Sequence, residues 1–346
     1  MAAHLDSPAW LVWLASLLEG VSRSTSRSAT LPPDLFSCAL DQLPLHLIPH
    51  GAGEYPLCSV HTLRISADCK ICRSGVLPDE VESEPDLRSC FALQGAIAWV
   101  RDRSGDLPVP FWLEPDLESA IGGLQAGAAV PESVPESTRS LLERAGILVC
   151  DRCRLQRAAQ REQMIQRAGA LFRAKGYAPV GGLIHPFHIA ALRRYYRYQI
   201  RTGAIQLGDG QSPRRYVAYN DPVARFFHRR IAATFSEVAG EPVKPSYVYL
   251  ASYLSGADLK KHTDREQCEF SITFCLDFTP EPELATPWPI SLDTAAGKVS
   301  VYQTLGDGLA YRGTRLPHYR STLGAGQTST SIFFHYVGSD FTGSLA

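Results

Sequence analysis

Short runs of strand-forming residues fill the chain between Tyr247 and Tyr336, and they constrain its fold more than any other feature. Gly, Pro and Asp separate the runs, which read YVYLASYL, EFSITFCLDF, KVSVYQTL, GLAYRG and TSTSIFFHY. Many short strands with such turn residues between them are typical of a sandwich or a small barrel. We therefore expect strands that close around a common interior in this part of the chain.

Two helical patterns precede these runs. Gln156–Lys175 has the spacing of an amphipathic helix that stops at Gly176, and His185–Thr202 has the spacing of a second helix. Helices followed by strands indicate the α+β class. The sequence therefore predicts a domain over residues 154–346 in which helices flank the strands.

The first 153 residues are less regular and rich in Pro, Gly and Ser. A hairpin is predicted at Gly95–Leu113, and its second arm contains two prolines, which are tolerated at a sheet edge. A short helix from Ser137 to Gly146 should lead into a strand at residues 147–149. Because domains average about 100–200 residues, we predict that residues 1–153 form a smaller, irregular accessory domain.

Composition excludes some classes of protein. The chain of 346 residues has 34 basic and 35 acidic side chains and a net charge of -1, so it lacks the excess of positive charge that marks proteins binding nucleic acid or anionic membranes. No apolar run approaches the ~20 residues of a membrane span, and the run AWLVWLASLL after Ser7 is predicted to be a short helix. Nine cysteines, an odd number, favour reduced thiols and a cytoplasmic location.

The segment His262-Thr263-Asp264 and the later His318 form a His-x-Asp…His pattern. Two imidazoles and one carboxylate are the facial ligand set of non-haem Fe(II), and they leave coordination positions open for oxygen and a co-substrate. His262 and Asp264 are two residues apart, so on a strand they point to the same side. We therefore predict an iron site; the alternative is that these are unrelated histidines near a chance aspartate.

Further residues accompany this pattern. Tyr253 and Gly256 precede His262 in the arrangement Y-x-x-G-x-x-x-x-x-H-x-D, and Gly306-Asp307-Gly308-Leu309 precedes His318. Together with the segment LFRAKGYAPVGGLIHPFHIAALRRYY, they resemble the prolyl-4-hydroxylase-like branch of the Fe(II)/2-oxoglutarate dioxygenases over roughly residues 165–338. The resemblance implies a C-terminal double-stranded β-helix, or jelly roll, with flanking helices.

The resemblance also implies a reaction. His262, Asp264 and His318 would bind Fe(II), and 2-oxoglutarate would chelate the metal through its keto-acid end. Enzymes of this family use O2 to convert 2-oxoglutarate into succinate while they oxidise an unactivated C–H bond. Related halogenases have a small residue in place of the carboxylate, so Asp264 favours hydroxylation over halogenation.

The chain departs from the family pattern at the anchor for the far carboxylate of 2-oxoglutarate. The family usually has Lys or Arg about ten residues after the second histidine, where this chain has Thr328. Because a buried carboxylate needs a cation, we expect Arg320, two residues after His318 on the same strand face, to supply it. The alternatives for the cation are Arg312 and Arg265, and additional hydroxyl contacts are expected from Tyr253, Thr328 and Thr330.

Two CxxC pairs suggest a second metal. Cys69-x-x-Cys72 and Cys150-x-x-Cys153 are separated by 77 residues, and two such pairs can hold one Zn(II) in a closed tetrahedral site. The sequence predicts a structural zinc that ties the ends of the accessory domain together; the alternative is four unconnected thiols. The remaining cysteines are expected to be buried apolar residues: Cys38, Cys58, Cys90, Cys268 and Cys275.

Several other residues have structural interpretations. His185 and His188 are expected at a capped helix start rather than as a ligand pair, and His335 is expected to be a satisfied residue of the core or the rim. The basic cluster Arg193, Arg194, Arg197 and Arg201 is expected on a solvated helix face. Trp288 either contacts substrate or anchors its loop.

These features predict a hydroxylase that requires Fe(II), 2-oxoglutarate and O2 and acts on a peptide or protein side chain docked on the accessory domain. A free amino acid or a carrier-bound natural product is the alternative substrate. Other classes remain open: a non-catalytic, cupin-like metal-binding or sensor protein, and an interaction protein held together by zinc. The expected partner is a peptide or small-molecule substrate, without nucleic acid or membrane, and a homo-oligomer remains open.

Overall fold

A computed structural model describes residues 34–40, 47, 63–84, 86–101 and 107–345. The helix expected after Ser7 and the expected burial of Cys58 lie outside these residues. Residues 31–346 form one compact unit. Within the described residues, no helix combines the length and the apolar character needed to cross a membrane.

Two antiparallel sheets contain most of the strands after residue 176. The larger sheet has seven strands in the order β6 (Tyr177–Val180), β14 (Gly308–Tyr311), β11 (Phe270–Thr279), β16 (Thr328–Gly338), β9 (Val243–Tyr253), β8 (Arg215–Tyr219) and β7 (Gln206–Leu207). The smaller sheet has four strands in the order β10 (Leu259–His262), β15 (His318–Arg320), β12 (Ile290–Thr294) and β13 (Gly297–Val301). The prediction of a mixed fold with helices and sheets is therefore confirmed.

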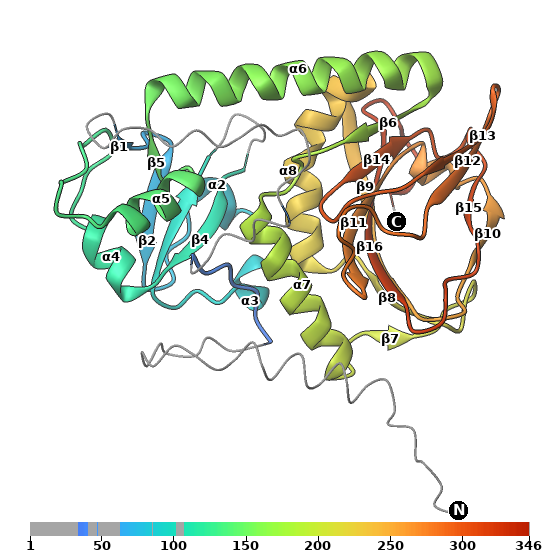
Figure 1. Ribbon diagram of the computed structural model, residues 1–346, viewed down its shortest axis with the longest axis horizontal. Helices are drawn as coiled ribbons and strands as arrows, with labels where there is room; N and C mark the ends of the chain where they lie inside the picture. Colours follow the sequence, from blue (N-terminus) through green and yellow to red (C-terminus); the bar gives the residue numbers. More distant parts are fainter. Residues whose placement is uncertain (1–33, 41–46, 48–62, 85, 102–106, 346) are drawn as a thin grey trace, which may run out of the picture. The chain divides into compact units, whose positions relative to one another are not determined.

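The chain passes repeatedly between these two sheets. From β9 to β12 successive strands alternate between the larger and the smaller sheet, and β14, β15 and β16 alternate again. The two sheets consequently face each other across a shared interior (Figure 1). Ile290, Leu292, Leu309 and Tyr311 from both sheets form a separate apolar cluster, so part of this interior is solidly packed.

The larger sheet has one face toward this interior and one toward the helices. On β16, Phe334 and Tyr336 pack against His228 of α8 (Pro222–Ala239), with ring centroids 5.7 and 4.6 Å apart. Their neighbours Phe333 and His335 line a cavity on the opposite face. This alternation follows from the two-residue period of a strand, and it determines which side chains reach the site described below.

The N-terminal region contains a three-stranded sheet and several short helices. Its strands are β2 (Cys69–Arg73), β3 (Ala96–Val100) and β4 (Val109–Leu113), and β1 (Arg64–Ile65) pairs separately with β5 (Leu148–Val149). Its helices are α2 (Asp79–Glu82), α3 (Leu87–Cys90), α4 (Pro115–Ile121) and α5 (Glu136–Arg144). The predicted hairpin is confirmed as β3 and β4, and its proline-containing arm is at the edge of the three-stranded sheet.

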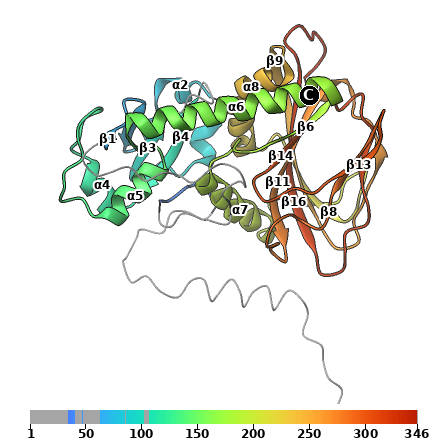
Figure 2. The ribbon, with the colours of Figure 1, turned by 45° about the horizontal axis from the view of Figure 1, so that its top comes forward.

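Helix α6 (Asp151–Lys175) is continuous through the predicted domain boundary at residue 153. Cys150 is its N-cap, and Gly176, in the left-handed conformation at φ 77°, ends it. Figures 1 and 2 show the helix leading from the N-terminal strands to β6. The division into two domains stays a prediction.

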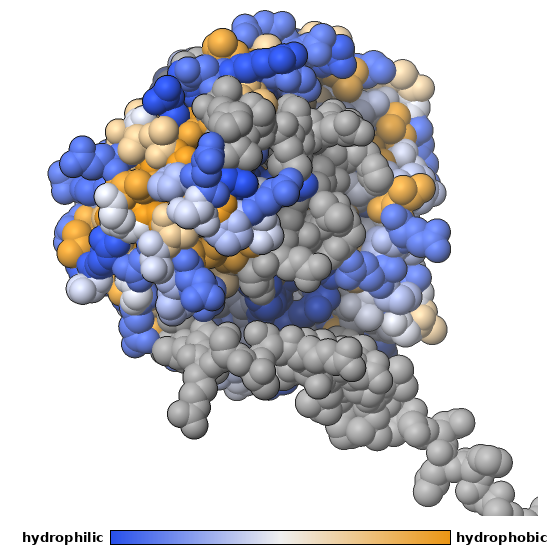
Figure 3. Space-filling model, turned by 60° about the vertical axis from the view of Figure 1, so that its left-hand side comes forward, coloured by the Kyte–Doolittle hydropathy of each residue, from blue (hydrophilic) through white to orange (hydrophobic). Residues whose placement is uncertain are grey.

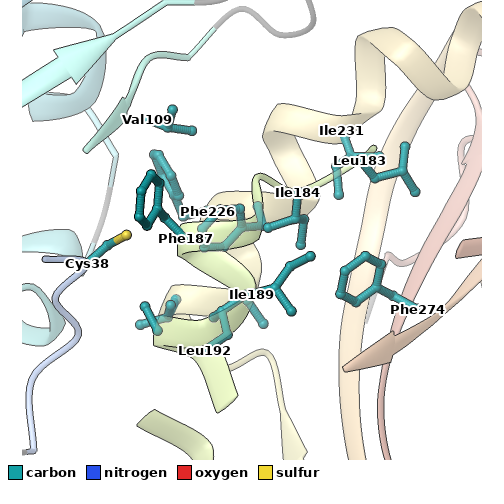
Figure 4. Packing of buried hydrophobic residues seen from close by; sticks show 14 of the residues in the cluster. Cys38, Val109, Leu183, Ile184, Phe187, Ile189, Leu192, Phe226, Ile231 and Phe274 are labelled. Atoms are coloured by element: carbon teal, nitrogen blue, oxygen red, sulfur yellow. The ribbon is translucent and has the colours of Figure 1, made fainter. Parts of the chain in front are cut away.

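Helix α7 (Pro186–Arg201) contributes to a core that residues of both regions share. Phe187 on α7 and Phe226 on α8 lie on the side of Cys38 and Val109, while Ile189 points toward Phe274 of β11 (Figure 4). Burial of such side chains stabilises a protein by about 1.5–3 kcal/mol each. The core that supports the larger sheet therefore includes residues from the N-terminal region.

The surface over the N-terminal region is mixed in character. Hydrophobic residues gather over part of this face and are bordered by hydrophilic ones (Figure 3). Val76 and Leu155 are the exposed large apolar side chains of the described residues up to 175, at 55% and 61% exposure. Two exposed large apolar side chains are not enough to identify a docking surface, because exposed apolar residues are normal on protein surfaces.

Candidate metal centre

His262, Asp264 and His318 converge as the sequence predicts. One potential ligand atom from each lies within 4.8 Å of the others. The Nε2 atoms of His262 and His318 are 3.6 and 3.5 Å from the same oxygen, Oδ1 of Asp264. The two histidines are register partners on the antiparallel strands β10 and β15, so backbone pairing holds their imidazoles side by side.

Backbone carbonyls fix which nitrogen of each imidazole is free. Nδ1 of His262 is 2.7 Å from the carbonyl oxygen of Lys260, and Nδ1 of His318 is 3.0 Å from that of Leu316. A carbonyl oxygen can only accept, so each Nδ1 carries the hydrogen and donates it. Both Nε2 lone pairs are then available, as a metal-binding histidine requires.

The backbone and a neighbouring serine hold Asp264. Its amide donates to the carbonyl of Gly313 (2.9 Å), and Ser271 donates from Oγ to Oδ2 (3.0 Å). The other carboxylate oxygen, Oδ1, faces the two histidines. The two oxygens therefore have different neighbours, and only Oδ1 faces both imidazoles.

The charges of the site favour its metal-binding form. Burial and the nearby His318 lower the pKa of His262, so its imidazole is neutral at neutral pH. Burial opposes ionisation of Asp264, but the nearby His318 and His335 and the hydrogen bond from Ser271 together leave the pKa of the carboxyl below its ordinary value. A neutral imidazole and a carboxylate are the forms that bind a cation.

A cavity of about 670 Å³ opens onto this centre. The strands β8, β9, β10, β15 and β16 supply much of its wall, together with the turn that follows β10. Six aromatic residues line it: Tyr219, Tyr247, Tyr249, Tyr253, Tyr311 and Phe333. The volume falls in the range of small-molecule sites, about 300–1,000 Å³.

Arg320, the first candidate for the co-substrate anchor, is a buried cation without a carboxylate partner among the described residues. Its guanidinium donates to the carbonyl of Trp288 (2.6 Å) and to Gln303 (3.3 Å), while its Nε atom is buried and makes no hydrogen bond. Burial lowers its pKa. An unpaired buried charge is costly, so this environment is suited to an anionic ligand.

Arg320 is not part of the cavity wall. Its guanidinium lies over the ring of Trp288 at 4.6 Å, and that ring lies 5.1 Å from Tyr253, which does line the cavity. Trp288 is buried and donates to the carbonyl of Ser321 (2.6 Å). Of its two interpretations, the loop anchor is therefore the one that these contacts support.

The other predicted anchors differ in position. Arg265 lines the cavity, whereas Arg312 does not and lies over Phe172 and Phe270. Thr330 donates to Ser252 (2.8 Å) on the helix side of the larger sheet, and neither it nor Thr328 lines the cavity. Their expected contacts with the co-substrate are not supported, because on β16 the odd-numbered residues face the interior.

Sequence reasoning missed Arg215. This residue of β8 is only 3% exposed, lines the cavity, donates to the Tyr253 hydroxyl (3.1 Å) and pairs with Asp209. Asp209 already neutralises its charge, whereas Arg320 has no counter-ion among the described residues. The alternating segment RYVAY is a recognisable strand signal, but nothing in it places Arg215 opposite strands that lie later in the chain.

The predicted zinc site is not formed. The clusters of three or more potential ligands in the described part of the chain do not include the four cysteines of the CxxC pairs. Cys69 and Cys72 are three residues apart on β2, so they point to opposite faces, and burial raises the pKa of Cys69 to about 12. Cys150 and Cys153 are disulfide-bonded, so the expectation of reduced thiols is wrong for these two.

The remaining structural interpretations can also be compared with the fold. His185 is the N-cap of α7, as expected, and Cys38, Cys90, Cys268 and Cys275 are buried, also as expected. Arg193 is not on a solvated face: it is 7% exposed and pairs with Asp277 of β11 at 2.9 Å. A helical charge pattern alone does not show that a sheet carboxylate lies beneath the helix.

No protein-family model and no curated protein matches the sequence. Among solved structures, the chain is similar to the non-haem α-ketoglutarate-dependent epimerase SnoN from nogalamycin biosynthesis, at 15% identity and a TM-score of 0.43, over 51% of this chain and 84% of that one. It is also similar to a Pseudomonas putida prolyl-4-hydroxylase, at 15% identity and a TM-score of 0.40, over 50% and 99% of the two chains. Similarity at this level does not decide the chemistry of this chain, which depends on its own residues.

Proposed function

We propose that the protein is an Fe(II)- and 2-oxoglutarate-dependent oxygenase, and that its two facing sheets form the jelly roll of that family. The convergence of two Nε2 atoms on one carboxylate oxygen, with both Nδ1 hydrogens held by carbonyls, carries the proposal. These donors fit Fe(II), because two imidazoles and a carboxylate occupy one face of the metal and leave the other face open.

The second support is the buried Arg320. Because Arg320 does not line the cavity, the proposed complex requires the side chains between the cavity and Arg320 to rearrange. The far carboxylate of 2-oxoglutarate then accepts a hydrogen bond from the Nε atom, which has no partner among the described residues. Tyr253 lines the cavity near this end, and its hydroxyl hydrogen remains available because the hydroxyl oxygen accepts from Arg215. A planar guanidinium suits a carboxylate better than an ammonium group does.

Bound iron would supply the activation of O2 that oxidises a C–H bond while 2-oxoglutarate is converted to succinate and CO2. The chain's own residues orient the reactants: His262, Asp264 and His318 define one face of the site, and tyrosine side chains form much of the facing wall. The cavity of about 670 Å³ admits a small molecule or a single side chain of a peptide. We propose hydroxylation as the outcome, because Asp264 occupies the position that a halide would need.

Metal and co-substrate binding test this proposal directly. Anaerobic calorimetry of the full chain should show one Fe(II) site, and 2-oxoglutarate should bind only after the metal. The His262→Ala and Asp264→Ala variants should lose Fe(II) binding and the conversion of 2-oxoglutarate to succinate, while their unfolding temperature stays close to that of the unaltered protein. Unchanged turnover in either variant would remove the mechanism.

A further inference from the structure

We infer that Ser271 and His335 act as a positioning pair that holds Asp264 so that only Oδ1 binds the metal. The inference rests on the proposed iron centre and adds two residues that do not contact the metal themselves. Asp264 is the one ligand of the three with two equivalent ligand atoms. Its binding mode therefore has to be set by whatever engages the second oxygen.

Hydrogen-bond directions in this pair are determined by what each group can do. The ionised Asp264 carboxylate only accepts, so the single hydroxyl hydrogen of Ser271 is donated to Oδ2 (3.0 Å). The Ser271 oxygen also lies 2.9 Å from Nδ1 of His335, and with its hydrogen used it can only accept there. His335 must then carry its hydrogen on Nδ1, and its donation keeps the serine hydroxyl directed at Asp264.

The pair is built on rigid elements. Ser271 on β11 and His335 on β16 are register partners in the larger sheet, and they are 0% and 6% exposed. Two aromatic rings lie beside His335: the Tyr247 ring is tilted at 4.6 Å, and the Phe333 ring is stacked at 6.4 Å. The ring contacts restrain His335, and the two hydrogen bonds of the buried Ser271 hydroxyl then set its direction.

Gly313 completes the arrangement from the other side. A Cβ atom at this position would lie 2.3 Å from Oδ2 of Asp264 and 2.9 Å from the Ser271 hydroxyl oxygen. The carboxylate therefore occupies the space that any side chain at 313 would need, while the Gly313 carbonyl accepts from the Asp264 amide. The Gly313 backbone and the Ser271 hydroxyl therefore enclose Oδ2 of Asp264.

A second cluster of potential ligands shows what this arrangement prevents. Asp264, Cys268 and His335 also present ligand atoms within 4.8 Å of one another. If Oδ2 were free, it could join this cluster or bind the same ion as Oδ1 and occupy a position that the reaction needs. The hydrogen bond from Ser271 keeps the carboxylate in one binding mode.

The experiment compares metal binding in matched variants. Ser271→Ala removes the donor to Oδ2, His335→Leu removes the donor to the serine, and His335→Asn retains an N–H near the position of Nδ1. Ser252→Ala is the control, because it also removes a buried hydroxyl from the same sheet, on the face away from the cavity, where it contacts Thr330. Fe(II) affinity is measured anaerobically by calorimetry, and the absorption spectrum of bound Co(II) reports the coordination geometry.

We expect Ser271→Ala and His335→Leu to weaken Fe(II) binding about 10- to 100-fold and to change the Co(II) spectrum. His335→Asn should recover most of the affinity, and Ser252→Ala should match the unaltered protein. Equal unfolding temperatures across the set exclude a general loss of structure. If one variant is less stable, the Co(II) spectrum of its folded fraction still reports the coordination geometry.

The measurements distinguish failure of the proposed function from failure of the positioning role. If the unaltered protein binds no Fe(II), the proposed function itself is wrong. If it binds Fe(II) and Ser271→Ala binds with the same affinity and Co(II) spectrum, the positioning role is overturned. A stoichiometry of two ions per chain, with the second lost in Cys268→Ser, would also overturn it, because Oδ2 would then be a ligand.

Discussion

The buried Arg320 has no carboxylate partner in the part of the chain that the structure describes, and this leads to a direct prediction. Arg320→Ala should raise the KM for 2-oxoglutarate about tenfold or more, because a hydrogen bond to a charged group contributes ~1.5–3 kcal/mol. Steady-state succinate formation at varied 2-oxoglutarate measures this. Arg312→Ala is the matched control and should leave the KM unchanged, since its guanidinium lies over Phe172 and Phe270 rather than in the interior.

A different result is expected if Arg215, and not Arg320, binds the far carboxylate of 2-oxoglutarate. Should Arg320→Ala leave the KM unaltered while Arg215→Ala raises it, the anchor would be the cavity-lining guanidinium that Asp209 neutralises here. Asp209 would then have to move away when the co-substrate binds.

Gly313 gives a second prediction at this scale. Gly313→Ala places a methyl group within 2.3 Å of both the Asp264 carboxylate and the Cys268 carbonyl, which are not flexible ends of a long side chain. We expect at least a tenfold loss of Fe(II) affinity together with a lower unfolding temperature. Gly210→Ala serves as a control, because the added Cβ meets nothing within 4 Å and the residue has ordinary backbone angles. An unchanged Fe(II) affinity in Gly313→Ala would show that the Asp264 carboxylate can move and still bind the metal.

At the level of elements, α7 is attached to the larger sheet by charge as well as by apolar packing. Arg193 and Asp277 are both nearly buried, and Asp277 also accepts two hydrogen bonds from Arg197. Removing one partner of a buried pair typically costs about 3–5 kcal/mol. We expect Arg193→Ala to lower the free energy of unfolding toward this range in denaturant titrations. The exposed Arg194 of the same helix is the control, and equal effects of the two substitutions would contradict a structural role for the pair.

The strands and helices were largely predictable, and their side-chain environments were not. Local patterns predicted the hairpin of β3 and β4, the helices α6 and α7, and the later strands, because caps, turns and periodicity are local signals. The triad was predictable for the same reason: His262 and Asp264 lie close in sequence, and the wider motif indicated His318. Arg215 and the Ser271–His335 pair were not identified, because their roles depend on pairing between strands that are distant in the sequence. Thr328 and Thr330 were chosen because they lie at or near the position of the family's usual cation, and that position does not determine the face of a strand.

At the scale of the whole molecule, buried histidines should make stability depend on pH. Burial lowers the pKa of His228 to about 3, compared with an ordinary value of about 6.5. The unfolded chain therefore binds a proton between these values and the folded chain does not. The contribution of His228 is fully present above pH 6.5 and decreases as the pH falls toward 3, by about 1.4 kcal/mol per pH unit.

The variant His228→Gln tests this dependence. Glutamine can keep a donor for the carbonyl of His335, which His228 contacts at 2.7 Å, but it does not titrate. Unfolding free energies measured between pH 4 and 7 should therefore show a shallower slope in the variant. A slope identical to that of the unaltered protein would mean that another group controls acid unfolding.

The carbonyls of Lys260 and Leu316, which accept from the two metal-facing imidazoles, belong to the main chain. Mutation exchanges side chains and leaves these oxygens in place, so no single substitution at either position deletes the acceptor. The backbone of these strands therefore determines which nitrogen of each ring carries the hydrogen. Substitutions at 260 and 316 do not change it. Variation at 260, which lines the cavity, can reshape its rim, and variation at 316 changes the packing against the apolar cluster of the two sheets, while the nitrogens that face the metal stay as they are.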